Sequence, residues 1–285
     1  MNQALRISLL SLVSCLGISA LLVSPALAQI FGSGPSPSVL FDVVVNLPGD
    51  EAEIPGGPNE NIGAIPFGGT NQLNVNDGGT LGDDFFASGT SEVNISGGTV
   101  GEGFTTICVS EVNISGGTVG DLFNALFASE VNISGGTFGD GLAALGDSVV
   151  NLSGGTVGNG FVVDFGSVVN ISGGTVGEGF TADFGSVVNI LGSEFQIDGL
   201  ELDTLLLDES FTITDRDVTL SGLLADGEQF SLDLNSVDLN SVDLFNSVDF
   251  FSPDATLTIT LAVPEPSSAA FIALVLAMGF ARRRR

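Results

Sequence analysis

The chain has 285 residues, with 40 glycines and 21 phenylalanines but no Trp, Tyr or His, and it is 44% hydrophobic with a formal net charge of −28 at pH 7. This composition excludes an ordinary helical domain and a disordered acidic tail, and it leaves enough apolar residues for a core. Nearly all positive charge lies at the two ends, so the acidic stretch between them repels nucleic acid and anionic lipid, which excludes direct nucleic-acid binding.

Residues 1–28 have the pattern of a secretory signal peptide. Arg6 precedes a mainly apolar run, and the small residues Ala26 and Ala28 stand just before Gln29. A positive start, an apolar centre and small residues at the end predict export and cleavage by signal peptidase at Ala28. An alternative cut stays open, because "LVSC" at 12–15 has the form of a lipoprotein acylation box.

Residues 29–70 contain "SVLFDVVVNLP" followed by turns rich in Pro and Gly, and they are expected to form an N-terminal cap. Residues 71–194 then repeat with a period of 19. The stretch "VNISGGTVGEGF" occurs at 93–104 and again at 169–180. The serine before each unit recurs at a constant interval, at Ser91, Ser110, Ser129, Ser148, Ser167 and Ser186.

Each unit alternates apolar and polar residues, as in Val93, Asn94, Ile95 and Ser96, which predicts short strands. The pair Gly97-Gly98 is expected to form a corner, because glycine adopts positive φ without steric cost. The pattern therefore predicts an all-β protein: a single-stranded β-solenoid of about seven coils with β caps, preceded by a signal helix and followed by a transmembrane helix.

Equivalent residues of successive coils are expected to stack into columns. Two interior columns begin at Val93 and Ile95, and a third is mostly aromatic, comprising Phe85, Phe104, Phe123, Leu142, Phe161 and Phe180. Cys108 falls at the position of Phe127, Gly146, Phe165 and Phe184 and is expected to fill the core.

Three polar columns are expected on the outside. The asparagines at the position of Asn94 are predicted to hydrogen-bond along the rod as a structural ladder. The second column is acidic, with Asp83, Glu102, Asp121, Asp140 and Glu178 interrupted by Asn159, and it is a candidate cation site. Calcium is the ion that it would take, but a solvated acidic face is the competing hypothesis and no metal site is assigned.

The third column is a candidate ice-binding or ligand-binding face, and it consists of Thr80, Thr99, Thr118, Thr137, Thr156 and Thr175. A strand-favouring residue beside the glycine pair explains the same pattern without a ligand.

Residues 195–262 are predicted to form a small β region that closes the far end of the rod. It contains a hairpin expected to turn at Asp226-Gly227. Arg216 lies between Asp215 and Asp217, and a local ion pair is expected there.

Residues 263–285 combine three signals in order. "VPEP" at Val263, Pro264, Glu265 and Pro266 precedes an apolar run of about 15 residues, a short membrane helix, and the chain ends at Arg282, Arg283, Arg284 and Arg285. The arginines would hold their end in the cytoplasm. This tail resembles the PEP-CTERM sorting signal of Gram-negative bacteria, a region also labelled as the C-terminal domain of ice-binding proteins. The resemblance implies recognition at Pro264 to Pro266 by exosortase, a transient membrane anchor, and release to the cell surface or extracellular matrix.

The sequence argues against an enzyme. Without His or Lys, catalytic triads, Schiff bases and imidazole metal sites are excluded, and the Trp and Tyr platforms of sugar-cleaving enzymes are missing. We expect an exported, non-catalytic surface or matrix protein without a cofactor, calcium excepted, that interacts with exopolysaccharide or cations. An ice-binding or adhesin-like solenoid is the alternative, and a polysaccharide-degrading enzyme is the third.

Overall fold

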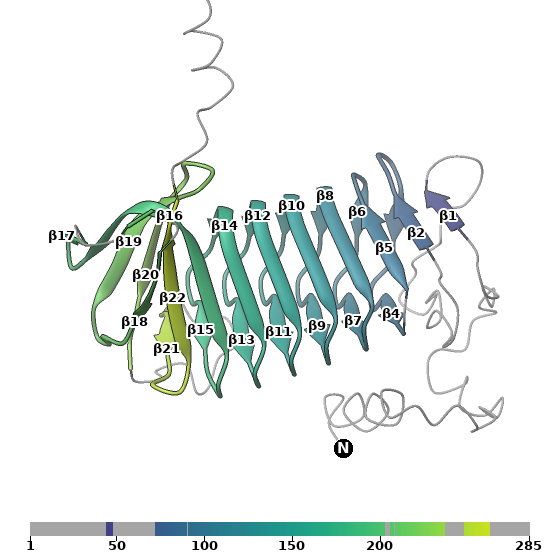
Figure 1. The fold of residues 1–285 in the computed structure, drawn as a ribbon. Coiled ribbons are helices and arrows are strands. Elements are labelled where there is room, and N and C mark those ends of the chain that lie inside the picture. The colour runs from purple at the N-terminus through teal and green to yellow at the C-terminus, as the bar shows by residue number, and fades with distance from the viewer. Residues whose placement is uncertain are drawn as a thin grey trace, which may run out of the picture.

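The computed structural model describes residues 44–47, 72–89, 91–202, 206–207, 209–236 and 248–262, and these segments contain strands and turns but no helix. The strands build a β-solenoid of about six turns, seen as a regular ladder in Figure 1. Each turn adds one strand to a large sheet and one to a smaller sheet, and each strand pairs in parallel with its equivalent in the next turn. The predicted all-β solenoid is confirmed, while both predicted terminal helices lie outside the described residues.

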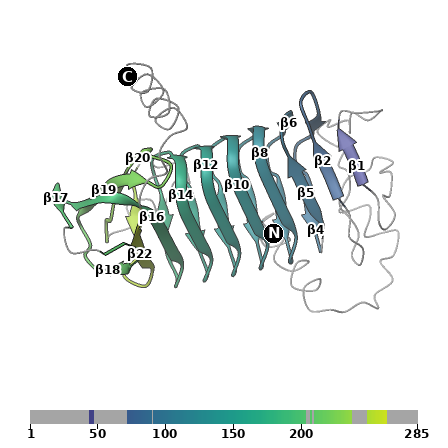
Figure 2. The same cartoon turned by 45° about the horizontal axis from the view of Figure 1, so that its top comes forward.

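The larger sheet carries the long strand of each turn, and Figure 2 shows these strands side by side along the rod. Its main path is β1 (Val44–Leu47), β2 (Gln72–Val75), β5 (Glu92–Ile95), β8 (Glu111–Val119), β10 (Glu130–Phe138), β12 (Val149–Val157), β14 (Val168–Val176) and β16 (Val187–Ile197). Two short strands follow β2 and β5 in the chain, β3 (Thr80–Leu81) and β6 (Thr99–Val100).

The smaller sheet carries the short strand of each turn. Its order is β4 (Phe86–Ser88), β7 (Thr105–Ile107), β9 (Asn124–Leu126), β11 (Ala143–Leu145), β13 (Val162–Asp164), β15 (Thr181–Ala182) and β21 (Phe250–Phe251). The pairing keeps the repeat in register, since Ala125 lies opposite Ala144 and Ala144 opposite Val163. Side chains from the two sheets meet between them as the core.

The core is made of stacked columns, as the sequence predicts. Val93 and Val112 are completely buried, and the aromatic column is no more than 3% exposed at any position. Neighbouring rings in that column contact each other, with centroids 4.9 Å apart for Phe104 and Phe123 and 5.2 Å apart for Phe161 and Phe180. Such contacts add to the stabilisation that each ring gains from burial.

One coil exchanges the sizes of two core side chains. Leu142 takes the place of a phenylalanine in the aromatic column, and in the same coil Phe138 takes a place that is Val119 and Val157 in the adjacent coils. The Phe138 ring lies 5.7 Å from that of Phe123, at an interplanar angle of 89°. The larger residue therefore lies next to the smaller one, and the volume of the layer is conserved.

The glycine pair does not form the predicted corner in the central coils. Strands β8, β10, β12 and β14 run through it, with a shift of register at this point. The second glycine has positive φ, +88° at Gly136. A Cβ on Gly135 would lie 2.4 Å from the carbonyl oxygen of Ser115 in the preceding coil. The pair thus forms a bulge within one long strand, where only glycine permits the close approach of two backbones.

The position of Cys108 is a strained outer turn rather than part of the main core. Cys108 is 4% exposed, but it packs with Ile107 and Leu126 in a small separate cluster. At the same position three coils farther on, Phe165 is 59% exposed, and Phe184 in the following coil is 61% exposed. Cys108 is therefore buried as expected, whereas the two phenylalanines at the same position are exposed, although the backbone is left-handed at all three residues.

The C-terminal part both extends the stack and covers its end. Besides β16 and β21 it contains β17 (Leu200–Glu201), β18 (Ser210–Ile213), β19 (Thr219–Leu224), β20 (Gln229–Asp233) and β22 (Thr256–Leu261). Strand β22 pairs in parallel with β16, with Ile259 opposite Ile190, as the strand of a further coil would, and each such in-register strand is called a rung. Strands β19 and β20 form the predicted hairpin, which turns at Gly227 with φ +93°.

Arg216 fixes the loop before this last rung. Its guanidinium donates to the carbonyl oxygens of Ser252 at 3.2 Å and Ala255 at 2.9 Å, and it lies 5.9 Å from the Phe251 ring centroid. It also donates to the carbonyls of Ile213 and Asp215. The interaction is therefore with backbone carbonyls and an aromatic face, in place of the expected local ion pair.

Candidate functional site

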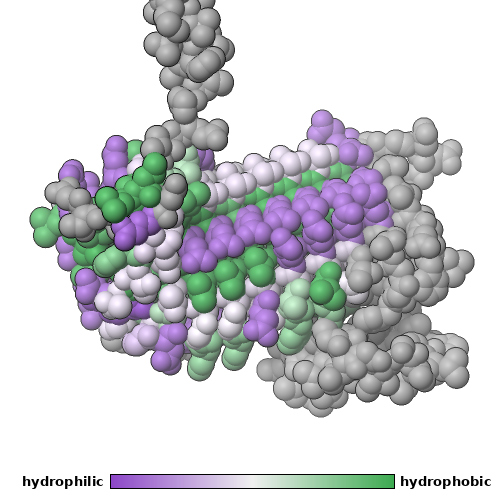
Figure 3. Space-filling model, in the orientation of Figure 1, coloured by the Kyte–Doolittle hydropathy of each residue, from purple (hydrophilic) through white to green (hydrophobic). Residues whose placement is uncertain are grey.

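The outer face of the solenoid carries its side chains in rows along the rod axis. Figure 3 shows a continuous hydrophilic row across the turns, beside rows of other hydropathy. The rows arise because the strands pair in register, so the same repeat position lies at the same place in each coil. A candidate site on this protein is therefore a row rather than a single pocket.

The asparagine row is a hydrogen-bonded ladder. Asn132 donates through Nδ2 to Asn113 Oδ1 at 3.0 Å, and its own Oδ1 accepts from Asn151 at 2.8 Å. The same bond recurs from Asn94 to Asn74 at one end and from Asn189 to Asn170 at the other. The predicted structural ladder is confirmed, and every bond in it points from one coil to the preceding coil.

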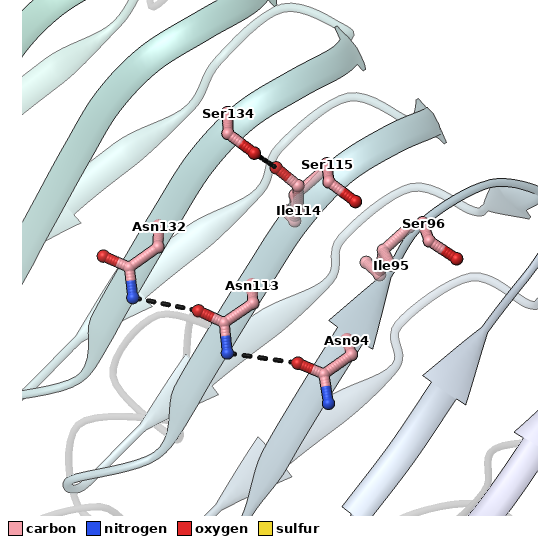
Figure 4. Close-up of a pocket in the computed structure, with 8 residues that line it drawn as sticks. All are labelled: Asn94, Ile95, Ser96, Asn113, Ile114, Ser115, Asn132 and Ser134. Atoms are coloured by element: carbon pink, nitrogen blue, oxygen red, sulfur yellow. Dashed lines mark hydrogen bonds between the residues drawn. The ribbon is translucent and has the colours of Figure 1, made fainter.

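A shallow groove runs beside this ladder, between the asparagines and a row of serines (Figure 4). Its lining comprises Asn94, Ile95, Ser96, Asn113, Ile114, Ser115, Asn132 and Ser134. Ser134 Oγ lies 3.4 Å from the Ile114 carbonyl oxygen of the preceding coil, to which it donates. An amide oxygen accepts two hydrogen bonds and the ladder uses one, so the groove retains acceptors for a ligand.

The acidic column lies on an exposed turn, and its side chains bind the backbone. Asp83 Oδ1 accepts from the Glu102 N–H at 3.0 Å, and Asp121 Oδ1 accepts from the Asp140 N–H at 2.9 Å. Asp140 accepts from Asn159, and Asn159 from Glu178, in the same way. Each Asp thus secures the next coil with one oxygen, and the described residues contain no group of three or more His, Cys, Asp or Glu arranged to hold a metal ion.

The threonine column is exposed along its whole length. Thr99 lies opposite Thr80 and Thr118 in the parallel ladder, and Thr156 lies opposite Thr137 and Thr175. All six side chains are solvent-exposed. The structure therefore brings the predicted face together as one straight row, with a single threonine per coil.

The predicted export and sorting residues lie outside the described residues. These are Ala26, Ala28 and Gln29 at the signal cleavage site, Val263, Pro264, Glu265 and Pro266 in the sorting motif, and Arg282, Arg283, Arg284 and Arg285 at the end. In the part of the chain that is described, no helix is long and apolar enough to cross a membrane.

Three carboxyl groups are perturbed by their surroundings, and one of them is Asp217, whose pKa is lowered by hydrogen bonds from the backbone N–H and the hydroxyl of Ser236. Burial raises the pKa of Asp249, although its side chain accepts hydrogen bonds from the N–H groups of Gly179, Phe180 and Asp233. Burial also raises the pKa of Asp164, and the charge of Asp183 in the next coil adds to this effect. Asp249 anchors the last rung through these backbone contacts, which is a structural task rather than acid–base catalysis.

The exposed pair Phe165 and Phe184 is the feature that the sequence-based assignment missed. Their rings stack with centroids 5.4 Å apart and planes within 4° of each other. The signal was a repeated "DFG" at 164–166 and 183–185, in which a bulky residue precedes a glycine at a turn. The stacked rings form a second surface feature, distinct from the polar rows.

Comparison with known proteins adds no assignment, since the chain matches no protein-family model, no curated protein and no solved structure.

Proposed function

We propose that the protein is an exported, non-catalytic solenoid of the cell surface or extracellular matrix, whose rows of side chains interact with exopolysaccharide or cations. One observation carries the proposal: the same polar side chain recurs at each coil in a straight row over about six turns. A ligand with a repeating structure can contact many coils of such a surface, whereas a single small substrate would use one.

The proposal includes the parts of the chain beyond the described residues. Residues 1–28 act as the signal peptide, and residues 263–285 act as an exosortase sorting signal with a short membrane helix that anchors the precursor. Residues 29–70 form the N-terminal cap, and the repeats of 71–194 amount to seven coils, with β16 starting the seventh. The parallel pairing of β1 with β2 supports the placement of this segment at that end of the rod.

A non-catalytic role is supported by the chemistry available on the rod. The full sequence has no His, and its acidic column already uses carboxylate oxygens to bind the next coil. A glycosidase would need two free carboxyl groups across a sugar-binding cleft. Assays for the release of reducing sugar from neutral and acidic polysaccharides are expected to be negative, and measurable turnover would contradict this part of the proposal.

The sorting proposal is tested in cells with and without exosortase. We expect the protein in the surface or matrix fraction of normal cells, lacking Arg282 to Arg285, and in the membrane fraction of exosortase-deficient cells with the arginines present. Mass spectrometry of the mature C-terminus distinguishes the two forms. Persistence of the arginines on the surface form would overturn the proposal.

Calcium is the cation proposed for the acidic column. Asp121 and Asp140 each commit one oxygen to the backbone, which leaves the other facing solvent at a spacing of about 4.8 Å between coils. Bound calcium would reduce the repulsion between successive carboxylates. We expect calcium to raise the thermal midpoint more than magnesium does at equal ionic strength, and equal effects would show screening alone.

Ice binding is the second candidate function, and the exposed threonine row favours it. An ice-binding face would modify the shape of growing ice crystals. Replacing Thr118 and Thr156 with Tyr would then abolish the effect, whereas a native protein that leaves crystals unchanged would exclude this function.

A further inference from the structure

The strongest unassigned feature is the stacked, exposed pair of phenylalanines at one corner of the rod. Phe165 is 59% and Phe184 61% exposed, and their rings are nearly parallel, 5.4 Å apart between centroids. Phe side chains are usually buried in folded proteins, so two exposed Phe rings are unusual. Because these two rings also contact each other, they form a preorganised apolar surface.

This corner does not need phenylalanine in order to fold. The backbone is left-handed at both residues, with φ of +50° at Phe165 and +39° at Phe184, which is unfavourable for a bulky side chain. In the preceding coil, glycine occupies the same position, at Gly146 with φ +66°. The left-handed backbone recurs at this position in the other coils, as at Cys108 and Phe127, so the two phenylalanines cost conformational energy there without filling the core.

Carboxylates flank the two rings. Asp164 precedes Phe165 and accepts a hydrogen bond from its N–H at 2.6 Å, and Asp183 does the same for Phe184 at 2.8 Å. Each uses Oδ1 for this contact, which leaves the second oxygen of each carboxylate as an acceptor. Because the rings stack, each covers one face of the other, so the corner offers the ring edges and the outer face of each ring together with two acceptors, repeated at the spacing of adjacent coils.

We infer that Phe165 and Phe184, together with Asp164 and Asp183, bind the sugar rings of a neutral polysaccharide. This inference rests on the proposed function and names a site and a ligand class for it. The apolar C–H face of a sugar ring packs on an aromatic ring, and sugar hydroxyls donate to carboxylates. A polyuronate or another anionic chain is disfavoured, because the carboxylates and the net charge of −28 repel it.

The experiment uses the full chain in native electrophoresis through gels that contain hydroxyethyl cellulose, alginate or no polysaccharide. We expect hydroxyethyl cellulose to retard the protein and alginate not to retard it. The double variant Phe165→Gly/Phe184→Gly should weaken retardation about tenfold, since two aromatic contacts are lost. Glycine suits the left-handed backbone, so this variant should keep its thermal midpoint, and the double change to Tyr should retain binding.

Val109→Gly is the matched control. Val109 is 68% exposed and has φ +59° at a corner of an earlier coil, so this change also removes an exposed apolar side chain from a strained turn. It should leave retardation unchanged.

Three results would overturn the inference: no retardation by hydroxyethyl cellulose, equal retardation of the glycine double variant, or binding to phosphatidylcholine vesicles that the double variant abolishes. The last result would assign the corner to lipid. Failure of this inference differs from failure of the proposed function, because cell fractionation reports on location even when the corner binds no sugar.

Discussion

The exchange of sizes between Phe138 and Leu142 gives a quantitative test of the stacked core. Phe138 is 3% and Leu142 1% exposed, and each differs in size from its counterparts in the adjacent coils. Phe138→Val alone should leave a cavity and destabilise the protein by about 2–3 kcal/mol. Leu142→Phe alone should overfill the layer and cost about 1–3 kcal/mol. The double variant recreates the pattern of the adjacent coils and should lie within about 1 kcal/mol of the original.

The free energies of unfolding of the original protein, the two single variants and the double variant are measured by urea denaturation followed by circular dichroism. The four unfolding curves are fitted with one shared m-value. The two single effects should therefore fail to add by about 2 kcal/mol or more, which is large for a double-mutant cycle. Additive effects would refute the argument that the two side chains share one volume in one layer. In that case the columns would not be coupled through the core.

Three further predictions concern contacts between coils. Gly135→Ala should destabilise the rod by about 2–3 kcal/mol in urea denaturation, because the added Cβ would meet the carbonyl oxygen of Ser115 at 2.4 Å. Gly185→Ala should cost only about 1 kcal/mol, because no atom lies within 4 Å of the added Cβ and only the positive φ opposes the change. Equal losses of stability in the two variants would contradict this. Asn132→Leu should cost about 1–3 kcal/mol, because it breaks two ladder bonds and leaves Asn113 and Asn151 each without one partner; an unchanged midpoint would show that the ladder is not stabilising. The pKa values of Asp164 and Asp249 are raised on folding, so these groups favour the folded state at a pH below their unfolded pKa, and the benefit is lost as the pH rises through the folded pKa. The thermal midpoint should therefore rise on acidification from about pH 7 to about pH 4, and the double variant Asp164→Asn/Asp249→Asn should show a smaller rise. An equal rise in the variant would assign the effect to the net charge of the protein.

The period of the sequence was sufficient to predict the stacking and the interior columns. Residues such as Val93 and Phe104 recur at one interval, and a parallel ladder with that period places each on its equivalent. The asparagine ladder followed for the same reason. Local backbone geometry was harder to predict, because a glycine pair fits a corner and a bulge equally well, and only the packing of Gly135 against Ser115 decides for the bulge.

The candidate site was predicted only in part. The threonine and acidic columns are straight and exposed, but the hydrogen bonds from backbone N–H groups to Asp121 and Asp140 depend on the turn geometry and not on the period. The exposure of Phe165 was missed, because an aromatic residue at a repeated position resembles core. The first rung was also missed, although "VVNL" at Val44–Leu47 is identical to Val149–Leu152 and pairs with β2 as a repeat would.

The register of the stack survives long detours of the chain. Asn74 lies opposite Asn46, 28 residues earlier, and Asn189 lies opposite Thr258, 69 residues later, yet both pairs align as adjacent coils do. The rungs therefore hold their alignment whatever length of polypeptide connects them. An inserted binding module between two coils would therefore leave the stack aligned and change only what the rod binds. Recombination between the nearly identical repeats would remove a coil and shorten the rod, and both of its ends would be kept.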